Sequence, residues 1–242
     1  MNSTYDPKYT EHHLRLFADQ MFNKYLFEGA EDEYAKSFND YLTKTSRIHF
    51  APEDFFSVEE HTIQEMGSTP YALQFLIFLG SLINPKVVVE IGSFVGFSTC
   101  NMAAALPTAQ RIIALDASEK FINTAKANAK KFSVDERIEF IHGDAISALS
   151  SQKIFNTEVD FVFIDGNKEN YLWFVKFFEE RISKGGVIVV DDCFFHGDVF
   201  NKNVKTKKGL GALECIEYLT KSEKWNTSLL PISNGIALAK RI

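Results

Sequence analysis

Apolar and polar positions follow two distinct rhythms from residue 86 to the end of the chain. Short runs of Val, Ile and Phe are apolar at nearly every position, which is typical of strands buried on both faces of a sheet. Longer segments between them carry apolar residues at three- and four-residue spacing, as amphipathic helices do. The expected strands are 86–92, 111–117, 137–145, 159–166 and 185–192, with one or two more in 227–241, and the expected helices are 96–106, 118–132, 170–182 and 210–221.

This order of elements predicts an α/β fold with a Rossmann-like, doubly wound, mostly parallel sheet and helices on both faces. Because crossovers between parallel strands are right-handed, the carboxyl ends of all the parallel strands share one edge of the sheet. Ligands of such sheets bind along that edge. The sequence therefore predicts that the residues following the strands form the functional site.

The first 60 residues have a more polar pattern and are interpreted as an N-terminal helical extension, with the α/β domain in 61–242. Segments 11–22 and 33–46 have helical spacing, and Pro52 in the break at 51–56 is suited to open a further helix. The most apolar segment, 71–83, is too short to span a bilayer and predicts a buried helix.

Carboxylates gather at the predicted carboxyl edge. Single acids there are common helix caps, but five successive strand ends with acids are hard to explain by capping alone. They are Glu90 near the end of the first strand, Asp116 after the second, Asp144 after the third, Asp165 after the fourth, and the adjacent pair Asp191 and Asp192 after the fifth.

Composition narrows the class of protein. A net charge of −6 argues against nonspecific nucleic-acid binding, so no nucleic-acid partner is expected. The three cysteines, Cys100, Cys193 and Cys215, form no CxxC pair, which favours a reducing compartment over a disulfide framework. The N-terminus has no apolar signal region, so we expect a cytoplasmic protein without a membrane partner.

The turn after the first strand indicates a nucleoside-type cofactor. Gly92 and Gly96 let the backbone approach a ligand, but Phe94 stands where a dinucleotide fingerprint needs glycine. Asp116 is placed to accept hydrogen bonds from ribose hydroxyls, and Asp144 lies where an adenine amino group is read. A glycine turn alone is common in βα loops. The combination of this turn with Asp116 and Asp144 is more specific for such a cofactor.

In these residues the chain resembles class I S-adenosylmethionine-dependent methyltransferases, and more narrowly the cation-dependent O-methyltransferases of the catechol and caffeoyl-CoA type. The segments that carry the resemblance are VVEIGSFVGFS, LDAS, GDA, FIDGNKENY, GGVIVVDD, HGDV and PISNGIALAKR, between about residue 64 and the C-terminus. The resemblance implies that 61–242 is the methyltransferase domain and that the protein transfers a methyl group from S-adenosylmethionine to a hydroxyl group.

The resemblance also implies roles for individual residues. The methionine end of the cofactor would meet Glu90, Gly92 and Ser98; Asp116 would hold the ribose, and Asp144 with Ala145 would face the adenine. The cofactor-binding set also includes Met66, Ser68 and Asp165. Asp165, Asp191 and Asp192 match the metal ligands, although the family often has Asn in place of Asp192. Ala72 and Leu73 are a second departure, because many relatives have a charged residue and a glycine there.

Three carboxylates from two strand ends would form an all-oxygen site suited to Mg²⁺, and also to Mn²⁺ or Ca²⁺, rather than to zinc. The structural alternative is a helix cap at Asp165 and a turn at 191–192, which leaves the clustered acids uncompensated. Cys193 is interpreted as buried packing, and His196 as a base, a substrate contact or a structural loop residue.

Methyl transfer from a sulfonium is an in-line displacement that needs a deprotonated oxygen. A cation chelated by vicinal oxygens lowers the hydroxyl pKa and orients the attack. Lys168, three residues after Asp165, is predicted to be the catalytic base, and the resemblance points to the same residue; a surface lysine is the alternative. Asp165 is predicted to serve catalysis as well as metal binding.

The acceptor is expected to be a small molecule, an aromatic one with vicinal hydroxyls. Candidate contacts are Phe55, Phe56, Tyr171, Trp173, Phe194 and Phe195, with Trp173 interpreted as core. Four lysines in 202–208 are either an anion-binding loop or a solvated one. The chain is expected to form a homodimer. The alternatives are a noncatalytic or an NAD-binding Rossmann-like protein.

Overall fold

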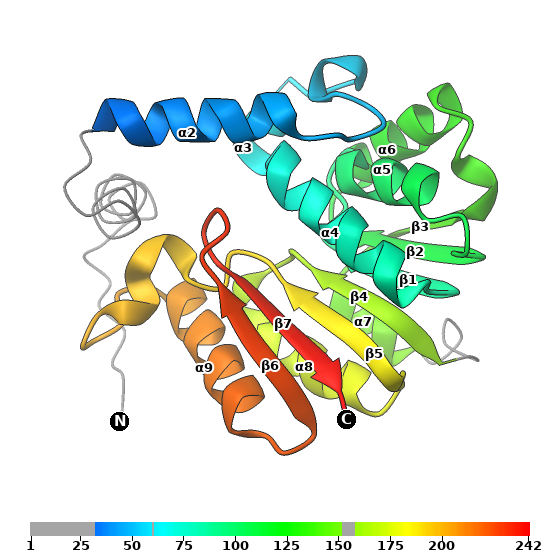
Figure 1. Ribbon diagram of the computed structural model, residues 1–242. Coiled ribbons are helices and arrows are strands. Elements are labelled where there is room, and N and C mark those ends of the chain that lie inside the picture. The colour runs from blue at the N-terminus through cyan, green and yellow to red at the C-terminus, as the bar shows by residue number, and fades with distance from the viewer. Residues whose placement is uncertain (1–31, 60, 152–157) are drawn as a thin grey trace.

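The computed structural model describes residues 32–59, 61–151 and 158–242 of the chain. Within them, seven strands form one sheet in the order β3-β2-β1-β4-β5-β7-β6 (Figure 1). The strands are β1 (Val87–Ile91), β2 (Arg111–Asp116), β3 (Ile138–His142), β4 (Val159–Ile164), β5 (Ile182–Val190), β6 (Trp225–Leu230) and β7 (Ile236–Arg241). β1 to β5 are parallel, and β7 runs antiparallel to both of its neighbours, β5 and β6.

The predicted doubly wound α/β fold is confirmed, since helices cover both faces of this mostly parallel sheet. One face packs against α4 (Pro70–Ile83), α5 (Phe97–Ala105) and α6 (Glu119–Lys131). The other packs against α7 (Ala145–Ser150), α8 (Tyr171–Glu179) and α9 (Lys207–Lys221). Alternate strand residues enter the two cores: Val88 faces the first group of helices, whereas Val89 faces the second.

The sheet reverses its order between β1 and β4, which makes this pair its topological switch point. β2 and β3 lie on one side of the pair, and β5 with the β7–β6 hairpin lies on the other. A crevice outside the carboxyl ends of β1 and β4 is where such sheets bind ligands. The fold therefore places the ends of β1 and β4 at the centre of the predicted site.

Before the sheet, the described chain contains α2 (Asp32–Thr45), the 3-10 turn η1 (Pro52–Asp54) and α3 (Ile63–Met66). The helical prediction for 33–46 agrees with α2, whereas the one for 11–22 lies outside the described residues. Pro52 opens only a single 3-10 turn. The predicted boundary at residue 60 stays a prediction, and Phe55 and Val58 before it already belong to the core under α4 and α5.

The remaining short elements are the 3-10 turns η2 (Asp135–Arg137), η3 (Lys168–Asn170) and η4 (Phe195–Phe200). The predicted helix 71–83 is α4, a half-buried helix that begins at Pro70 after the N-cap Thr69. No helix in the described parts of the chain has the length and apolar character needed to cross a membrane. All three cysteines are free and buried, as expected for Cys193.

Candidate functional site

A cavity of about 760 Å³ opens at the carboxyl edge of the sheet. Residues from the ends of β1, β2, β4 and β5 line it, together with the segment between α3 and α4 and the β6–β7 turn. Of the predicted site residues, it brings together Met66, Ser68, Gly92, Asp116, Asp144, Ala145, Asp165, Lys168, Asp191 and Asp192. Glu90 and Ser98 are the two that do not line it.

Gly92 forms the floor of the cavity. Its φ of +92° belongs to the left-handed region, and a Cβ there would lie 2.3 Å from the Asp165 carbonyl oxygen. The amides of Gly92 and Ser93 both donate to the Leu115 carbonyl, at 2.8 and 3.1 Å. Glycine is therefore required where the ends of β1 and β4 approach each other.

Glu90 and Ser98 lie behind this turn and bind each other. The Glu90 carboxylate is fully buried and accepts hydrogen bonds from the hydroxyls of Ser98 and Thr99. Burial raises the pKa of Glu90 from 4.5 to about 7, although both hydroxyl bonds lower it. Their predicted contact with the methionine end of the cofactor stays a prediction.

Asp116 and Asp144 stand at one end of the cavity with different surroundings. Asp116 accepts from the amides of Phe94 and Ser118, both at 2.9 Å, and burial raises its pKa. Asp144 is exposed and caps α7 through the Ser147 amide and hydroxyl, at 2.9 and 2.8 Å, and these bonds lower its pKa. Asp144 is thus both a helix cap and a cavity residue.

The segment before α4 covers the same end of the cavity. Met66 is 44% exposed, and the buried Ser68 hydroxyl has no hydrogen-bond partner within the described residues. An unpaired buried hydroxyl is costly, so it indicates a polar group that fills the space. Thr69 ties this segment to the β6–β7 turn through a hydroxyl contact with Ser233 at 2.9 Å.

Three carboxylates and one ammonium form the other end. The Lys168 Nζ lies 3.4 Å from Asp165 Oδ1 and 3.0 Å from Asp192 Oδ2. Asp191 is buried and accepts the Asp192 amide at 2.8 Å. Asp192 has a left-handed φ of +50°, an uncommon backbone conformation for a residue other than glycine. The Lys168 ammonium therefore pairs with two of the three acids.

The pKa shifts differ among the three acids. Burial, and then repulsion from the other acids, raises the pKa of Asp191 well above its usual range. Burial also raises the pKa of Asp165 to about 7, against the attraction of Lys168. Burial alone would raise the pKa of Asp192 as well, but Lys168 holds it low. Ionisation is thus opposed at Asp165 and Asp191 and favoured at Asp192.

Lys168 differs from the sequence-based expectation in one respect. Burial by itself lowers its pKa, but Tyr171, Asp192 and Asp165 outweigh burial and raise it well above the ordinary value. The prediction assumed a depressed pKa caused by a neighbouring cation. These neighbours favour the protonated ammonium of Lys168, and its role as base stays a prediction.

The cluster has no preformed coordination shell. Across the described ranges, no three His, Cys, Asp or Glu side chains are arranged to hold a metal ion. Asp192 instead pairs with Lys168. A metal would have to compete with this ammonium for the Asp192 carboxylate.

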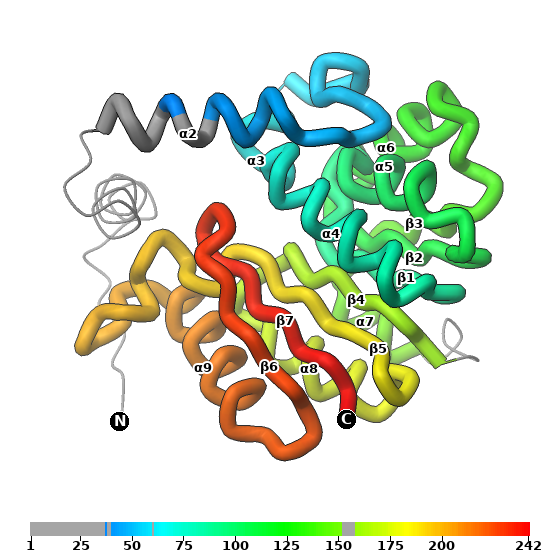
Figure 2. The backbone as a smooth tube through the Cα atoms, viewed as in Figure 1, coloured from blue at the N-terminus to red at the C-terminus, as the bar shows by residue number. Residues whose placement is uncertain are grey.

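Sequence reasoning missed Ser233 and Asn234, which line the cavity from the β6–β7 turn. The Asn234 side chain hydrogen-bonds to Asp192 and lowers its pKa. The tube in Figure 2 shows this turn beside the chain that follows β5, where the Phe194 amide donates to the Asn234 carbonyl at 2.8 Å. The Asn-Gly pair predicts a turn, but only the place of β7 beside β5 brings that turn to the acids.

The predicted aromatic contacts with the acceptor lie outside the cavity wall. Its aromatic side chains are Phe94, Phe121 and Phe174, together with the imidazole of His196. The earlier candidates occupy other places: Tyr171, Phe194 and Phe195 are buried in the core, as is Phe55, and Trp173 packs against that core as expected, whereas Phe56 is exposed.

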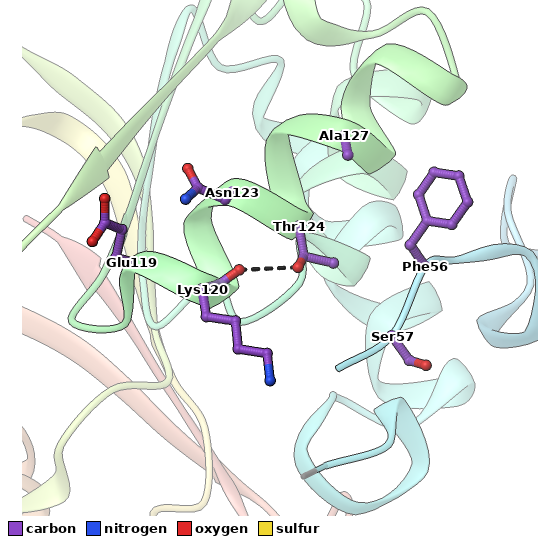
Figure 3. A pocket seen from close by; sticks show the side chains of 7 residues that line it. All are labelled: Phe56, Ser57, Glu119, Lys120, Asn123, Thr124 and Ala127. Atoms are coloured by element: carbon purple, nitrogen blue, oxygen red, sulfur yellow. Dashed lines mark hydrogen bonds between the residues drawn. The ribbon is translucent and has the colours of Figure 1, made fainter. Parts of the chain in front are cut away.

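Phe56 contributes to a second hollow, a shallow one of about 560 Å³ on the outer side of α6. Figure 3 shows that it lies between the segment at 56–57 and the α6 side chains, with Lys120 and Asn123 among them. Apart from Phe56, none of the predicted site residues lines it. The hollow is therefore separate from the strand-end site.

Known proteins with similar sequences and folds are methyltransferases. A caffeoyl-CoA O-methyltransferase of Medicago sativa is 30% identical over 216 residues, which is 84% of this chain and 87% of the relative. A flavonoid 3',5'-methyltransferase of Vitis vinifera is 28% identical over 77% of this chain and 83% of its own. The O-methyltransferase of Bacillus cereus, solved with SAH, has a TM-score of 0.68 at 20% identity, covering 96% of this chain and all of that one.

The fold and the strand-end site define an S-adenosylmethionine-dependent methyltransferase. More narrowly, the chain belongs to the O-methyltransferase family, whose model matches residues 54–242. The predicted enzyme class and its dependence on S-adenosylmethionine are thereby confirmed, whereas the divalent cation stays a prediction. The alternatives of an NAD-binding or a noncatalytic protein are not supported by these matches.

Proposed function

We propose that this O-methyltransferase depends on a divalent cation and methylates a hydroxyl of a small aromatic acceptor with vicinal hydroxyls. The observation that carries the proposal is the cluster of Asp165, Asp191 and Asp192 around the single ammonium of Lys168. It lines the same cavity as Asp116 and Asp144, the residues proposed for the ribose and the adenine. Cofactor and acceptor sites thus share one cavity.

The donor set fits a hard cation. All three candidate ligands are carboxylates, and carboxylate oxygens are preferred by Mg²⁺, Mn²⁺ and Ca²⁺. Burial, and then repulsion from neighbouring acids, raises the pKa values of Asp165 and Asp191, and a bound cation would favour their ionised form. A bound cation would chelate the two acceptor oxygens and lower the pKa of the hydroxyl to be methylated.

The residues of the chain then have separate tasks. Met66, Ser68 and Gly92 would enclose the cofactor, with Ala145 beside the adenine; of these, the unpaired Ser68 hydroxyl most directly supports a polar ligand. Lys168 would take the proton from the acceptor hydroxyl. Because Tyr171, Asp192 and Asp165 raise its pKa, it would act as a base only when positive charge near those acids lowers that pKa.

The acceptor class rests on the relatives and on the cavity wall. The relatives are named for caffeoyl-CoA and flavonoids, both aromatic compounds. Phe174 and His196 line the cavity together with the acids, and flat side chains of this kind suit a planar ring. A homodimer in the cytoplasm completes the proposal; the three free, buried thiols support the reducing compartment.

A metal-removal experiment tests the proposal. Cofactor binding and methyl transfer to catechol, caffeoyl-CoA and a flavonoid are measured after exhaustive EDTA treatment and after Mg²⁺ or Mn²⁺ is returned. We expect S-adenosylmethionine to bind in both states, because its proposed contacts lie at other strand ends, and transfer to occur only with metal. Full turnover in EDTA would refute the metal-dependent mechanism.

A further inference from the structure

The segment between the acids and α9 has an unusual backbone. Phe195, His196 and Gly197 are three consecutive residues with positive φ, of 39°, 53° and 79°. For residues other than glycine such a backbone costs free energy and persists only where the surrounding structure holds it. His196 lines the cavity, so the segment that must be held is part of the site.

Backbone bonds close this turn, since the Phe195 amide donates to the Asp192 carbonyl and the Gly197 amide to the Phe194 carbonyl, both at 2.9 Å. Asp198 anchors the chain directly after it. Its carboxylate has no exposed surface and lies two residues after His196. Oδ1 accepts from the Asn201 side chain at 3.0 Å and the Lys205 amide at 2.8 Å. Oδ2 accepts from the Thr206 amide at 2.9 Å and the Thr206 hydroxyl at 2.8 Å. One carboxylate thus organises the whole segment before α9.

The same carboxylate fixes the first turn of α9. Thr206 is the N-cap of α9, and its hydroxyl accepts the Gly209 amide at 2.9 Å while donating to Asp198. A Cβ on Gly209 would lie 2.2 Å from Asp198 Oδ2, so only glycine lets the helix approach this closely. Lys208, in that first turn, lines the cavity. Asp198 therefore connects His196 and Lys208 from behind the cavity wall.

We propose that Asp198 is a positioning residue that sets the acceptor side of the cavity by fixing His196 and Lys208. This rests on the proposed function, because it assigns that wall to the acceptor. Asp198 itself does not line the cavity and touches no reacting atom. Removing its charge would release the wall and weaken acceptor binding, while the cofactor side, built from β1, β2 and the segment before α4, would keep its structure.

Glu179 provides a matched control. It is another buried carboxylate, and it accepts from the Tyr218 hydroxyl at 2.7 Å, the Trp225 indole at 2.9 Å and Lys224. It joins α8 to α9 and β6, and it does not line the cavity. A purely structural effect of losing a buried carboxylate should therefore appear equally in Glu179→Gln and in Asp198→Asn.

The experiment measures catechol binding by calorimetry to the chain with S-adenosylhomocysteine and Mg²⁺, and KM and kcat for methyl transfer. Asp198→Asn is nearly isosteric but turns an NH₂ group toward backbone amides that need an acceptor. We expect catechol affinity to fall by about tenfold and its KM to rise equally, the factor typical of one lost buried hydrogen bond. S-adenosylhomocysteine affinity should stay within about twofold, as should catechol affinity in Glu179→Gln.

Thr206 supplies a second test should Asp198→Asn fail to fold. Thr206→Val removes the hydroxyl and Thr206→Ser keeps it, so catechol affinity should fall in the first variant and recover in the second. Equal catechol affinity in Asp198→Asn and Glu179→Gln, or in both Thr206 variants, would overturn the inference. A wild-type chain that binds catechol but transfers no methyl group would contradict the proposed function alone; one that binds no catechol would overturn both.

Discussion

The ammonium of Lys168 forms ion pairs with two of the three clustered acids, Asp165 and Asp192. Burial, with repulsion from neighbouring acids, raises the pKa values of Asp165 and Asp191. Burial lowers the pKa of Lys168, but Tyr171 and the acids outweigh it and raise that pKa. At this scale Lys168 has two roles. It stabilises the acids by ion pairing, and it is the group proposed to remove the proton of the acceptor hydroxyl when a cation takes its place beside the acids.

Replacement of Lys168 tests the base. Lys168→Met keeps the length of the side chain and removes the amine, so turnover should fall by about 10²–10⁴, the usual span for a general base. An acceptor phenol that is already ionised should recover part of the rate. Lys221→Met, which removes an exposed lysine paired with Glu217 on α9, is the control. Normal turnover with every acceptor would mean that solvent takes the proton.

Asp191 tests the metal site. Asp191→Asn removes one candidate ligand charge, and we expect weaker Mn²⁺ binding in titrations followed by electron paramagnetic resonance, together with reduced turnover. Asp160→Asn is a suitable comparison, because Asp160 accepts bonds from the Lys86 and Val87 amides and from Ser183, away from the cavity. If Asp191→Asn binds Mn²⁺ with wild-type affinity, Asp191 and Asp192 form a structural turn and not a metal site.

Glu90 predicts a pH dependence of stability. Its pKa is raised in the folded chain from 4.5 to about 7, so between these values the folded state holds a proton that the unfolded state has lost. The stabilisation that this proton gives the folded state is complete below pH 4.5 and is lost as the pH rises through about 7. Urea unfolding should show that the free energy of unfolding of the wild type falls by ~3 kcal/mol more than that of Glu90→Gln across that window. Parallel curves of unfolding free energy against pH for the two proteins would contradict the raised pKa of Glu90.

At the scale of elements, two buried asparagines attach the segment before α3 to the methyltransferase domain. Asn101 accepts from the His49 and Phe50 amides, both at 2.9 Å. Asn128 accepts the Phe56 amide at 2.7 Å and donates to the carbonyls of Phe56 and Val95, at 3.0 and 2.9 Å. Because Val95 belongs to the turn after β1, these amides connect the segment to the cofactor side.

Asn128→Asp tests this attachment. The substitution keeps the acceptor for Phe56 but faces two carbonyls with a carboxylate, so the free energy of unfolding should fall by roughly 2–4 kcal/mol. Asn123→Asp on the outer side of the same helix, where it borders the shallow hollow of Figure 3, should change it by less than about 0.5 kcal/mol. If urea unfolding shows equal losses of unfolding free energy in Asn128→Asp and Asn123→Asp, the amide contacts of Asn128 contribute little to stability.

Local sequence predicted most strands and helices but not where β5 begins or that α7 exists. β5 starts at Ile182, three residues before the expected Gly185, because Ile182 pairs with Val159 across a register shift that absorbs the two glycines. α7 has six residues with little apolar periodicity, and its Asp144 cap is its main signal. Such short elements depend on neighbours that are distant in sequence.

The same distinction applies to the site. The acids at strand ends could be predicted, because parallel topology alone brings Asp116, Asp165 and Asp191 to one edge. Asn234 and Ser233 could not, because their position depends on the β6–β7 hairpin joining β5 in antiparallel orientation. The organising role of Asp198 also depends on tertiary contacts, since its partners lie three to eight residues further along an irregular segment.

At the scale of the whole molecule, α4 carries an apolar face that the described chain does not cover. Phe78 and Leu82 lie one helical turn apart and are 59% and 66% exposed. Tyr41 on α2, a helix that contacts α4, is 65% exposed. Exposed aromatic and aliphatic side chains grouped in this way are typical of subunit interfaces. We therefore place the proposed homodimer contact on this face.

A two-fold dimer would bury the α4 face of both subunits, because the same surface patch meets itself across the axis. Light scattering at micromolar concentration should then give twice the 27.5 kDa chain mass. Leu82→Glu should yield the monomer, since a buried, unpaired carboxylate would face its symmetry mate. Thr220→Glu adds the same charge at an exposed position of α9, on the opposite face of the sheet, and should remain dimeric. A 27.5 kDa wild-type mass would refute the dimer, and dissociation by both variants alike would place its contact elsewhere than on the Phe78–Leu82 face.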